Sequence, residues 1–271
     1  MTSTTSLGYD GKRVVVAGGG GDGMGAAAAS LLVELGAEVI VLDLREPTVE
    51  GVTFHRTDLG DATEIEHAVE RVGAPVGALF NCQGVSGTAP GMSSRTVMAV
   101  NLLGLRHLTE LVLPLIPDGG AVVSISSAGG LGWERRAAEI LSLLAARGMD
   151  EGLAWCDAHD EALLPQPFPN AYAFSKQTLI LWTLQLATTS ITNGVRVNVT
   201  SPGSTSTVMA RDFPDEGVDM MNHPSGRSST PVEQAWPLVY LNSPLASYVN
   251  GVNVPVDGGN FAARTVKRLC K

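Results

Sequence analysis

The sequence predicts an α/β protein in which a parallel sheet of about seven strands is wound between two layers of helices. Short runs of β-branched and other apolar residues recur along the chain, and segments of helix-forming composition separate most of them. Several of these runs are apolar throughout, as expected for strands that are covered on both faces. Strands that alternate with helices are typical of a parallel, doubly wound sheet.

The expected elements follow one another in a simple order. The first strand is a run of valines that ends in a glycine-rich turn, and the alanine-rich segment after the turn is expected to be a helix. The seven expected strands are Arg13–Gly18, Glu38–Asp43, Thr53–His55, Val76–Asn81, Ala121–Ser126, Val195–Thr200 and Val252–Val256. The expected helices include Ala26–Leu35, Ala62–Arg71, Thr96–Leu115 and Tyr172–Thr192.

Two segments interrupt this alternation. The first, at about residues 131–169, has apolar residues at helical spacing followed by an acidic, proline-punctuated run, and it is expected to be a helical insertion. The second, at about residues 204–230, is rich in Met, Ser, Asp and Pro; long irregular segments of this kind are commonly lids or binding loops. Because no internal repeat or linker is visible, residues 1–271 are expected to form a single domain.

Composition narrows the class of function. A net charge of −9 and a pI near 5.0 argue against a nucleic-acid partner and against an anionic membrane surface. Three cysteines without paired spacing suit a reducing cytosol, and the five scattered histidines predict no metal site. The polar N-terminus lacks a signal core, and no apolar run is long enough to span a bilayer. We therefore expect a cytoplasmic protein with a small-molecule substrate.

Tyr172 and Lys176 stand four residues apart, at the start of an apolar segment expected to be a buried helix. Positions i and i+4 of a helix lie on the same face, so the phenol and the ammonium are expected to be neighbours. A free tyrosine has a pKa of about 10, and a neighbouring cation favours the phenolate and lowers that pKa. The pair is a candidate for acid–base catalysis. Taken alone, the same spacing more often means an exposed lysine beside a half-buried tyrosine.

A glycine-rich turn, Gly19–Gly25, follows the first strand and opens the first helix. Glycine allows the tight turn and the close approach of a pyrophosphate, and the helix N-terminus offers N–H groups to the phosphates. Asp43, at the end of the second strand, is positioned to accept hydrogen bonds from ribose hydroxyls and to repel a 2′-phosphate. Asp22 adds negative charge and Arg45 is the counter-argument, so the balance favours NAD over NADP.

Together these motifs resemble the short-chain dehydrogenase/reductase family, over nearly the whole length of the chain. The matching segments are Gly18–Gly25, Asp58-Leu59, Asn81-Cys82-Gln83-Gly84, Asn101, Ile125-Ser126-Ser127, Tyr172 with Lys176, Pro202-Gly203 with Thr207, and Val256–Gly259. The resemblance implies a Rossmann-type fold and reversible hydride transfer between NAD and a carbinol carbon. Intact catalytic positions disfavour a non-catalytic dinucleotide-binding redox sensor, and enoyl reduction usually goes with a different tyrosine spacing.

The resemblance also implies roles for individual residues. Tyr172 would be the acid or base, Lys176 would lower its pKa and hold the nicotinamide ribose, Ser127 would bind the substrate oxygen, and Asn101 would hold a water for the proton. The implied cofactor-binding residues are Gly19, Asp22, Gly23, Met24, Gly25, Asp43, Leu44, Asp58, Leu59, Asn81, Gln83, Gly84, Tyr172, Lys176, Pro202, Gly203, Thr205 and Thr207.

Two branches of the family remain open. The insertion between Ser127 and Tyr172, with the run Ser243–Gly259, resembles the bacterial 3α-hydroxysteroid dehydrogenase/carbonyl reductases. Asn81–Ala89 and Gly251–Asn253 are similar to the coniferyl-alcohol dehydrogenases. Hydroxysteroid chemistry is the first expectation, and an aromatic alcohol is the alternative.

The chain also departs from the family pattern. Gly18 replaces the usual threonine, whose hydroxyl would tie the turn to the fourth strand. Cys82 and Gln83 replace Asn and Ala, and we hypothesise that the Gln83 amide supplies the missing hydrogen bond. These changes concern the geometry of the loop and not the chemistry.

Substrate and subunit contacts are further expectations. Ser127 and Tyr172 would contact the substrate, Trp133 would wall the pocket, and Met209, Phe213, Met220 and Met221 would form an apolar lid. A homodimer or homotetramer is expected, paired through Thr96–Leu115 and Tyr172–Thr192. The basic tail Arg264–Lys271 is expected to be a frayed end rather than a subunit contact.

Overall fold

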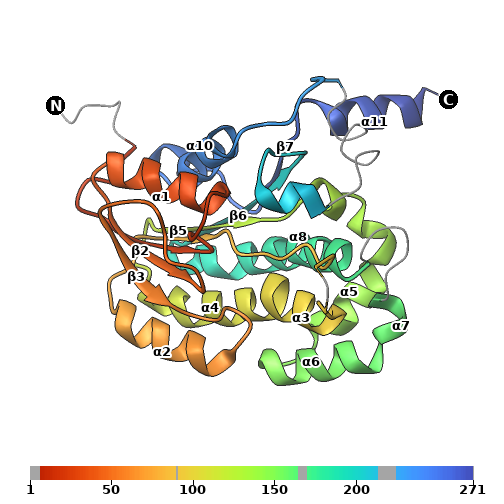
Figure 1. Cartoon of the computed structure of the whole chain (residues 1–271), viewed down its shortest axis with the longest axis horizontal. Helices are drawn as coiled ribbons and strands as arrows, with labels where there is room; N and C mark the ends of the chain where they lie inside the picture. The colour runs from red at the N-terminus through yellow and green to blue at the C-terminus, as the bar shows by residue number, and fades with distance from the viewer. Residues whose placement is uncertain (1–6, 90, 164–169, 213–223, 271) are drawn as a thin grey trace.

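The structure is a computed structural model that describes residues 7–89, 91–163, 170–212 and 224–270. Seven parallel strands form one sheet in the order β3-β2-β1-β4-β5-β6-β7, which confirms the predicted fold class (Figure 1). The strands are β1 Arg13–Ala17, β2 Glu38–Asp43, β3 Val52–Arg56, β4 Ala78–Asn81, β5 Ala121–Ile125, β6 Arg196–Pro202 and β7 Asn253–Val256.

Helices cover both faces of this sheet. The α-helices are α1 Met24–Glu34, α2 Ala62–Val72, α3 Ser94–Met98, α4 Gly104–Val112, α5 Ala137–Leu144, α6 Gly148–Ala158, α7 Asp160–Leu163, α8 Asn170–Ser190, α10 Pro231–Leu241 and α11 Asn260–Leu269. Short 3₁₀ or π segments are η1 Ala99–Leu103, η2 Leu113–Leu115, η3 Ala128–Gly130, η4 Trp133–Arg136, η5 Ile191–Asn193, η6 Val208–Asp212 and η7 Pro244–Ala246. In Figure 1, α1 and α10 lie above the sheet, and α2, α4 and α8 lie below it.

The packing explains why the central strands are apolar throughout. Val14 and Val16 of β1 face the core beneath α1 and α10, whereas Val15 faces the core formed by α2, α4 and α8. All three valines are fully buried. A strand in this position must be apolar on both faces, since helices exclude water from each.

The sheet order also locates a binding crevice. The chain runs from β1 outward to β3, returns to β4 beside β1, and then continues to β7. In open α/β sheets, ligands bind outside the carboxyl ends of the strands at such a reversal. The glycine-rich turn after β1 and the residues after β4 both lie at this point.

The insertion is helical, as expected, and the acidic run within it also forms helices, α6 and α7. It docks on α8 through a row of stacked groups. The Arg136 guanidinium lies 4.3 Å from the Phe174 ring centroid, and Trp155 stacks on Phe174 at 5.7 Å and on His159 at 4.0 Å. Residues 164–169 of the expected insertion lie outside the described part of the chain.

Three further expectations need correction or comment. The segment expected as one helix over Thr96–Leu115 is interrupted by the π-helical turn η1. The tail expected to be frayed forms α11. Among the described residues, one helical segment, Ser94–Leu115, is long and apolar enough to cross a membrane, but 67% of its most apolar window is buried, as in a core helix.

Candidate active site

The carboxyl end of β5 and the first turns of α8 bring Ser127, Tyr172 and Lys176 together. Ser127 is half-buried just after β5, and its hydroxyl forms a hydrogen bond with the Tyr172 side chain. The Lys176 Nζ lies 5.9 Å from the centroid of the Tyr172 ring, on the same face of α8. The i,i+4 spacing thus produces the predicted neighbourhood of phenol and ammonium.

Hydrogen bonds on both sides of Lys176 fix α8 against β5. The Lys176 Nζ donates to the carbonyl oxygen of Ile125 at 2.8 Å, and the Ser126 hydroxyl donates to the carbonyl oxygen of Lys176 at 2.8 Å. A Cβ on Gly130 would lie only 2.8 Å from that same carbonyl oxygen, so the loop after Ser127 can approach α8 only with glycine there. The backbone therefore sets the distance between Ser127 and Tyr172.

Asn101 lies in the π-helical turn η1, a kind of turn that is frequent at functional sites. Its Oδ1 accepts from the Val85 N–H at 2.8 Å, and its Nδ2 donates to the Val85 carbonyl at 3.0 Å. A Cβ on Gly84 would lie 3.5 Å from both the Asn101 Oδ1 and the Lys176 Nζ. Asn101, Gly84 and Lys176 therefore border the same small space.

Burial sets the protonation of the two titratable groups. Desolvation raises the pKa of Tyr172 above its ordinary value, and the hydrogen bond with Ser127 opposes that rise. Desolvation lowers the pKa of Lys176 to about 8, with the charge of Cys82 acting in the opposite direction. In this ligand-free chain the expectation of a lowered tyrosine pKa is wrong, because burial outweighs a lysine whose Nζ is directed at Ile125.

The glycine-rich turn forms a cradle that side chains would fill. A Cβ on Gly25 would meet the carbonyl of Gly18, and a Cβ on Gly20 would meet the carbonyl of Arg45. Gly18 has φ +81°, and a Cβ there would collide with the backbone of Gln83, so the threonine of the family pattern does not fit this turn. A Cβ on Gly23, by contrast, meets open space in front of α1. These features fit the approach of a dinucleotide pyrophosphate to a helix N-terminus.

Asp43 is built into the wall of this cradle. Its carboxylate accepts from the N–H of Gly20 at 2.8 Å and from the N–H of Arg45 at 2.9 Å. The Arg45 guanidinium lies over the turn, 3.2 Å from where a Cβ of Gly21 would be. One carboxylate with free lone pairs and one arginine therefore border the expected ribose position.

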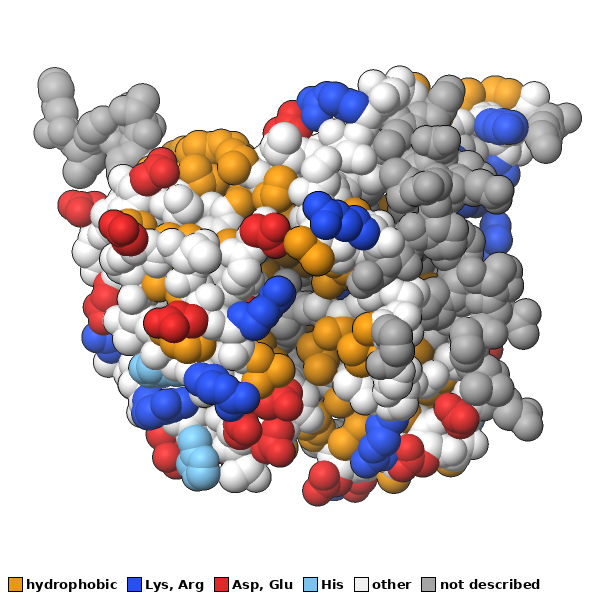
Figure 2. All heavy atoms as spheres, viewed as in Figure 1, with side chains coloured by type: hydrophobic (Ala, Val, Ile, Leu, Met, Phe, Trp, Pro, Cys, Tyr) orange, Lys and Arg blue, Asp and Glu red, His pale blue; other side chains and the backbone are white. Residues whose placement is uncertain are grey.

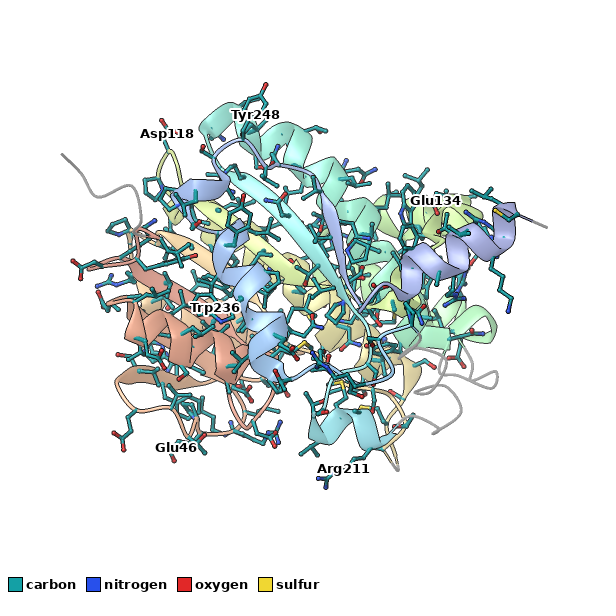
Figure 3. All side chains as sticks on the ribbon, turned by 90° about the horizontal axis from the view of Figure 1, so that it is seen from above. Glu46, Asp118, Glu134, Arg211, Trp236 and Tyr248 are labelled. Carbon is teal, nitrogen blue, oxygen red and sulfur yellow. The ribbon has the colours of Figure 1, made fainter. Side chains whose placement is uncertain are left out.

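A cavity of about 360 Å³ lies on the other side of the turn, between Asp22 and the segment after β6. It is lined by Asp22, Ser204, Thr205, Ser206, Thr207, Val208, Ala210, Arg211 and Ser228. Thr205 and Thr207 were expected at the site. Ser204, Ser206, Val208, Ala210, Arg211 and Ser228 were not, although all but Ser228 lie within ten residues of Pro202 and adjacency would have suggested them. Arg211 points outward from η6 in Figure 3.

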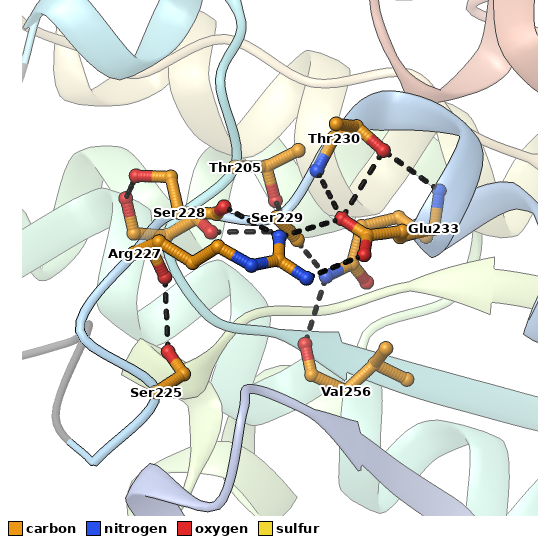
Figure 4. A network of polar contacts seen from close by, with 10 residues as sticks. Thr205, Ser225, Arg227, Ser228, Ser229, Thr230, Glu233 and Val256 are labelled. Carbon is orange, nitrogen blue, oxygen red and sulfur yellow. Dashed lines mark hydrogen bonds and ion pairs between the residues drawn. The ribbon is translucent and has the colours of Figure 1, made fainter.

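The two ends of the 204–230 segment are joined beside this cavity (Figure 4). The Ser229 N–H donates to the Ser204 carbonyl at 3.0 Å, and the Ser206 N–H donates to the Ser229 carbonyl at 2.8 Å. Arg227 pairs with Glu233 on α10, whose side chain also accepts from the Thr230 N–H. Both strands of the segment's base are thereby anchored to α10.

The remaining expected cofactor residues surround the cradle. Leu44 is exposed after β2, Leu59 is buried, and the Asp58 carboxylate accepts from the Gly60 N–H. Asn81 donates to Thr109 and Ser124 inside the core. Pro202 ends β6, and the Gly203 N–H donates to the Val256 carbonyl at 3.0 Å. Met24 is the first residue of α1.

The hypothesis that the Gln83 amide ties the glycine turn is wrong. Gln83 is 4% exposed, and neither its Nε2 nor its Oε1 has a hydrogen-bond partner among the described residues. The close backbone contact between Gly18 and Gln83 holds the turn instead. Burial raises the pKa of the Cys82 thiol to about 12, so this cysteine is protonated at neutral pH.

The structure describes only some of the expected substrate contacts. Trp133 is half-buried and packs on the apolar cluster that includes Phe174 and borders Tyr172. Met209 is half-buried in η6. Phe213, Met220 and Met221 lie outside the described residues. Among those described, no three His, Cys, Asp or Glu side chains gather as a metal ion would require.

Family models match the chain in two adjoining parts. Residues 12–138 match a model described as short chain dehydrogenase, and residues 139–260 match one described as enoyl-(acyl carrier protein) reductase. Together they span the cradle, the Ser127–Tyr172–Lys176 group and the segment after β6.

Individual relatives align over nearly their whole length. A coniferyl-alcohol dehydrogenase of a Pseudomonas species is 32% identical over 92% of this chain and 96% of its own. A 3-alpha-hydroxysteroid dehydrogenase/carbonyl reductase of Comamonas testosteroni is 27% identical over 91% of this chain and 95% of its own. The solved 3-alpha-hydroxysteroid dehydrogenase of Pseudomonas sp. B-0831 complexed with NADH superposes with a TM-score of 0.78 at 27% identity, covering 94% of this chain and 99% of that one.

Proposed function

The chain belongs to the short-chain dehydrogenase/reductase family of oxidoreductases, and on that premise we propose that it interconverts a secondary alcohol and a ketone with NAD. The alcohol is a 3α-hydroxysteroid. The observation that carries the proposal is the grouping of Ser127, Tyr172 and Lys176 on β5 and α8, beside a glycine cradle that fits a dinucleotide. An acid–base group beside a hydride-carrier site is what alcohol oxidation requires.

Each residue has a role that follows from its position. Tyr172 exchanges the hydroxyl proton with the substrate through its Oη. Ser127, already hydrogen-bonded to Tyr172, orients the substrate oxygen and stabilises charge that develops there. Lys176 is buried and bonded to Ile125, so it favours the phenolate and binds ribose hydroxyls by a small change of rotamer. Asn101 holds the loop at Val85 and lines the exit for the proton.

A bound nicotinamide would supply the hydride chemistry, which no side chain can provide. The residues of this chain would bind and orient the dinucleotide. Asp43 would accept from the adenosine ribose, the cradle of Gly19, Gly23 and Gly25 would receive the pyrophosphate, and Thr205 and Thr207 would border the nicotinamide end. Asp43 and Asp22 would disfavour a 2′-phosphate, which supports NAD over NADP.

An aromatic alcohol is the second candidate substrate. It is favoured by the 32% identity to a coniferyl-alcohol dehydrogenase, which exceeds the identity to the hydroxysteroid enzymes. The likeness in backbone to the solved hydroxysteroid dehydrogenase favours the first candidate. The proposal further includes a single domain over residues 1–271, a cytoplasmic location and a homodimer or homotetramer.

The test is NAD⁺ reduction followed by absorbance, with a 3α-hydroxysteroid and with coniferyl alcohol. Turnover of the steroid that is lost in Tyr172→Phe, with NAD⁺ binding retained, supports the proposal. Turnover of coniferyl alcohol alone moves the substrate to the second candidate. Tight NAD⁺ binding without turnover of a broad alcohol panel would favour a dinucleotide sensor instead.

A further inference from the structure

The outward side of α10 carries a line of exposed apolar side chains. Val232, Trp236 and Tyr240 follow one another at i, i+4 and i+8, and they are 46%, 45% and 44% exposed. Figure 2 shows hydrophobic side chains gathered at the upper edge of the molecule, where Figure 1 places α10. Single exposed apolar residues are ordinary, but a line with two aromatic rings marks a contact surface.

The line continues beyond the end of the helix. Leu245 is 50% exposed in η7, which follows α10, and Tyr248 is fully exposed. We call these five residues, Val232, Trp236, Tyr240, Leu245 and Tyr248, the α10 face. Figure 3 looks down on α10, with Trp236 near the middle of that side and Tyr248 at its rim. No charged residue occurs from Gln234 to Val256, although 17% of the chain is charged.

Buried polar contacts hold this surface rigid. The Tyr9 hydroxyl donates to the Val239 carbonyl at 2.7 Å, and the Asn242 Nδ2 donates to the Leu79 carbonyl at 2.9 Å. Arg196, 3% exposed, donates to the carbonyls of Leu241 and Ser243. A surface fixed in this way loses little entropy when it binds a partner.

The helices first expected to pair are covered by the chain's own insertion. α5, α6 and α7 pack on α3, η1 and α8 in one apolar cluster. A Cβ on Gly152 of α6 would lie 2.5 Å from the Leu103 side chain, so the two elements are in close contact. Arg106 of α4 has a side chain only 11% exposed and lies beneath the insertion loop, where it reaches the Ala146 carbonyl.

The free edge of the sheet is also a poor route for pairing. β7 is the outermost strand, and Pro255 within it has no N–H to offer an added strand. A partner that uses this side of the molecule must therefore pack against side chains. The α10 face is the surface that provides them.

We propose that the α10 face is where a second copy of this chain docks, in a twofold contact that places α10 against α10. Copies that each carry a net charge of −9 repel one another, and an uncharged segment minimises that repulsion at the contact. Full burial of an aromatic side chain removes about 150–250 Å² from water. The exposed parts of the three rings then supply roughly 400 Å², half of the about 800 Å² that each partner of a stable interface buries.

Sedimentation velocity of the full chain at micromolar concentration tests this inference, which rests on the self-association proposed above. The wild type is expected at twice or four times the mass of the 28.2 kDa chain. Trp236→Glu/Tyr240→Glu is expected to halve that mass and to raise the dissociation constant at least about 100-fold, because central aromatic residues dominate interface energies. Circular dichroism and NAD⁺ binding establish that the variant is folded.

Two matched variants identify the face. Leu141→Glu on α5 and Ile191→Glu in η5 place a charge on side chains that are 48% and 42% exposed elsewhere, and both are expected to keep the wild-type mass. A monomeric wild type, an unchanged mass in the α10 variant, or dissociation by either control would overturn the inference. Alcohol turnover is measured separately, so a dimer without activity counts against the proposed function alone.

Discussion

At the scale of single residues, two opposing contacts decide the protonation of Tyr172. Burial raises the pKa of its phenol, and the hydrogen bond with Ser127 lowers it. In Ser127→Ala the second effect disappears, so the pKa rises further and the limb on which alcohol oxidation increases with pH moves to higher pH. A loss of about 10²–10³ in kcat is expected as well, because the donor to the substrate oxygen is gone.

The pH profile of kcat/KM for wild type and Ser127→Ala measures this shift. Ser126→Ala is the control, since its hydroxyl donates to the Lys176 carbonyl and not to the phenol. An unchanged or acid-shifted limb in Ser127→Ala would contradict the assignment of Tyr172 as the titrating base.

Lys176 links stability to pH in the opposite sense from most paired groups. Burial lowers its pKa in the folded chain to about 8, while the unfolded chain keeps its proton up to about 10.4. Unfolding therefore takes up a proton between these values, and folding stability rises with pH through that window. Relative to Lys176→Met, the wild type is expected to gain about 2 kcal/mol from pH 7 to about pH 9.5.

Urea unfolding at both pH values measures this gain as a difference of differences. The comparison removes groups that titrate equally in the two proteins. Parallel pH dependences would show that Lys176 keeps its ordinary pKa in the folded chain.

Residue spacing was enough to find the catalytic candidates, and burial explains what it missed. Four residues between Tyr172 and Lys176 predict one helix face, which α8 shows. The sign of the Tyr172 pKa shift depends on how much water the fold excludes, which no local pattern states. The Gln83 amide was assigned a bond on the basis of its neighbour Gly18, but side-chain direction depends on packing from other elements.

At the scale of elements, the insertion is held to α8 by the row Arg136, Phe174, Trp155 and His159. Phe174 is fully buried at its centre, whereas His159 is exposed at its end. Phe174→Ala is expected to cost about 3–5 kcal/mol, since it opens a cavity beside Tyr172. His159→Ala is expected to cost less than about 1 kcal/mol. Equal costs in denaturant unfolding would mean that the stack is not the principal contact of the insertion.

The π-helical turn η1 is joined to the adenine side of the site through Gly104. A Cβ on Gly104 would collide with the carbonyl of Leu59, which follows Asp58 in the loop after β3. Gly104→Ala must therefore displace that loop or η1, and we expect at least about tenfold weaker NAD⁺ binding together with lower stability. Isothermal titration measures the binding. Gly119→Ala, at a glycine with positive φ and open space, is the control for backbone strain alone.

At the scale of the whole molecule, alternation of apolar runs was enough to predict the parallel sheet, because a strand covered on both faces has a composition that can be read locally. The interruption of the helix at η1 could not be read in this way, since Ala99–Leu103 is as good a helix former as its neighbours. The surface left free for a partner was also out of reach. It depends on which helices the insertion covers, and so on packing between segments far apart in sequence.

The choice of dinucleotide is a property of the whole fold, because a ligand that binds only the folded chain stabilises all of it. At a concentration of 100 times its dissociation constant, NAD⁺ adds about 2.7 kcal/mol. Each kcal/mol raises the Tm of a domain of this size by about 2–4 °C, so a rise of at least about 5 °C is expected. The same concentration of NADP⁺ is expected to give a clearly smaller rise, since its 2′-phosphate meets Asp43.

Asp43→Asn separates this contact from general electrostatics. Its carboxylate lies on the Gly20 and Arg45 N–H groups, so the ligand-free Tm of each variant serves as its own baseline. Asp43→Asn is expected to narrow the difference between the shifts with NAD⁺ and NADP⁺. Glu46→Gln removes the same charge three residues away, from a side chain that points into solvent in Figure 3, and is expected to preserve the difference. If both variants narrowed it equally, long-range charge and not contact with the ribose would select the dinucleotide, and Arg45 over the glycine turn would then be the residue to replace next.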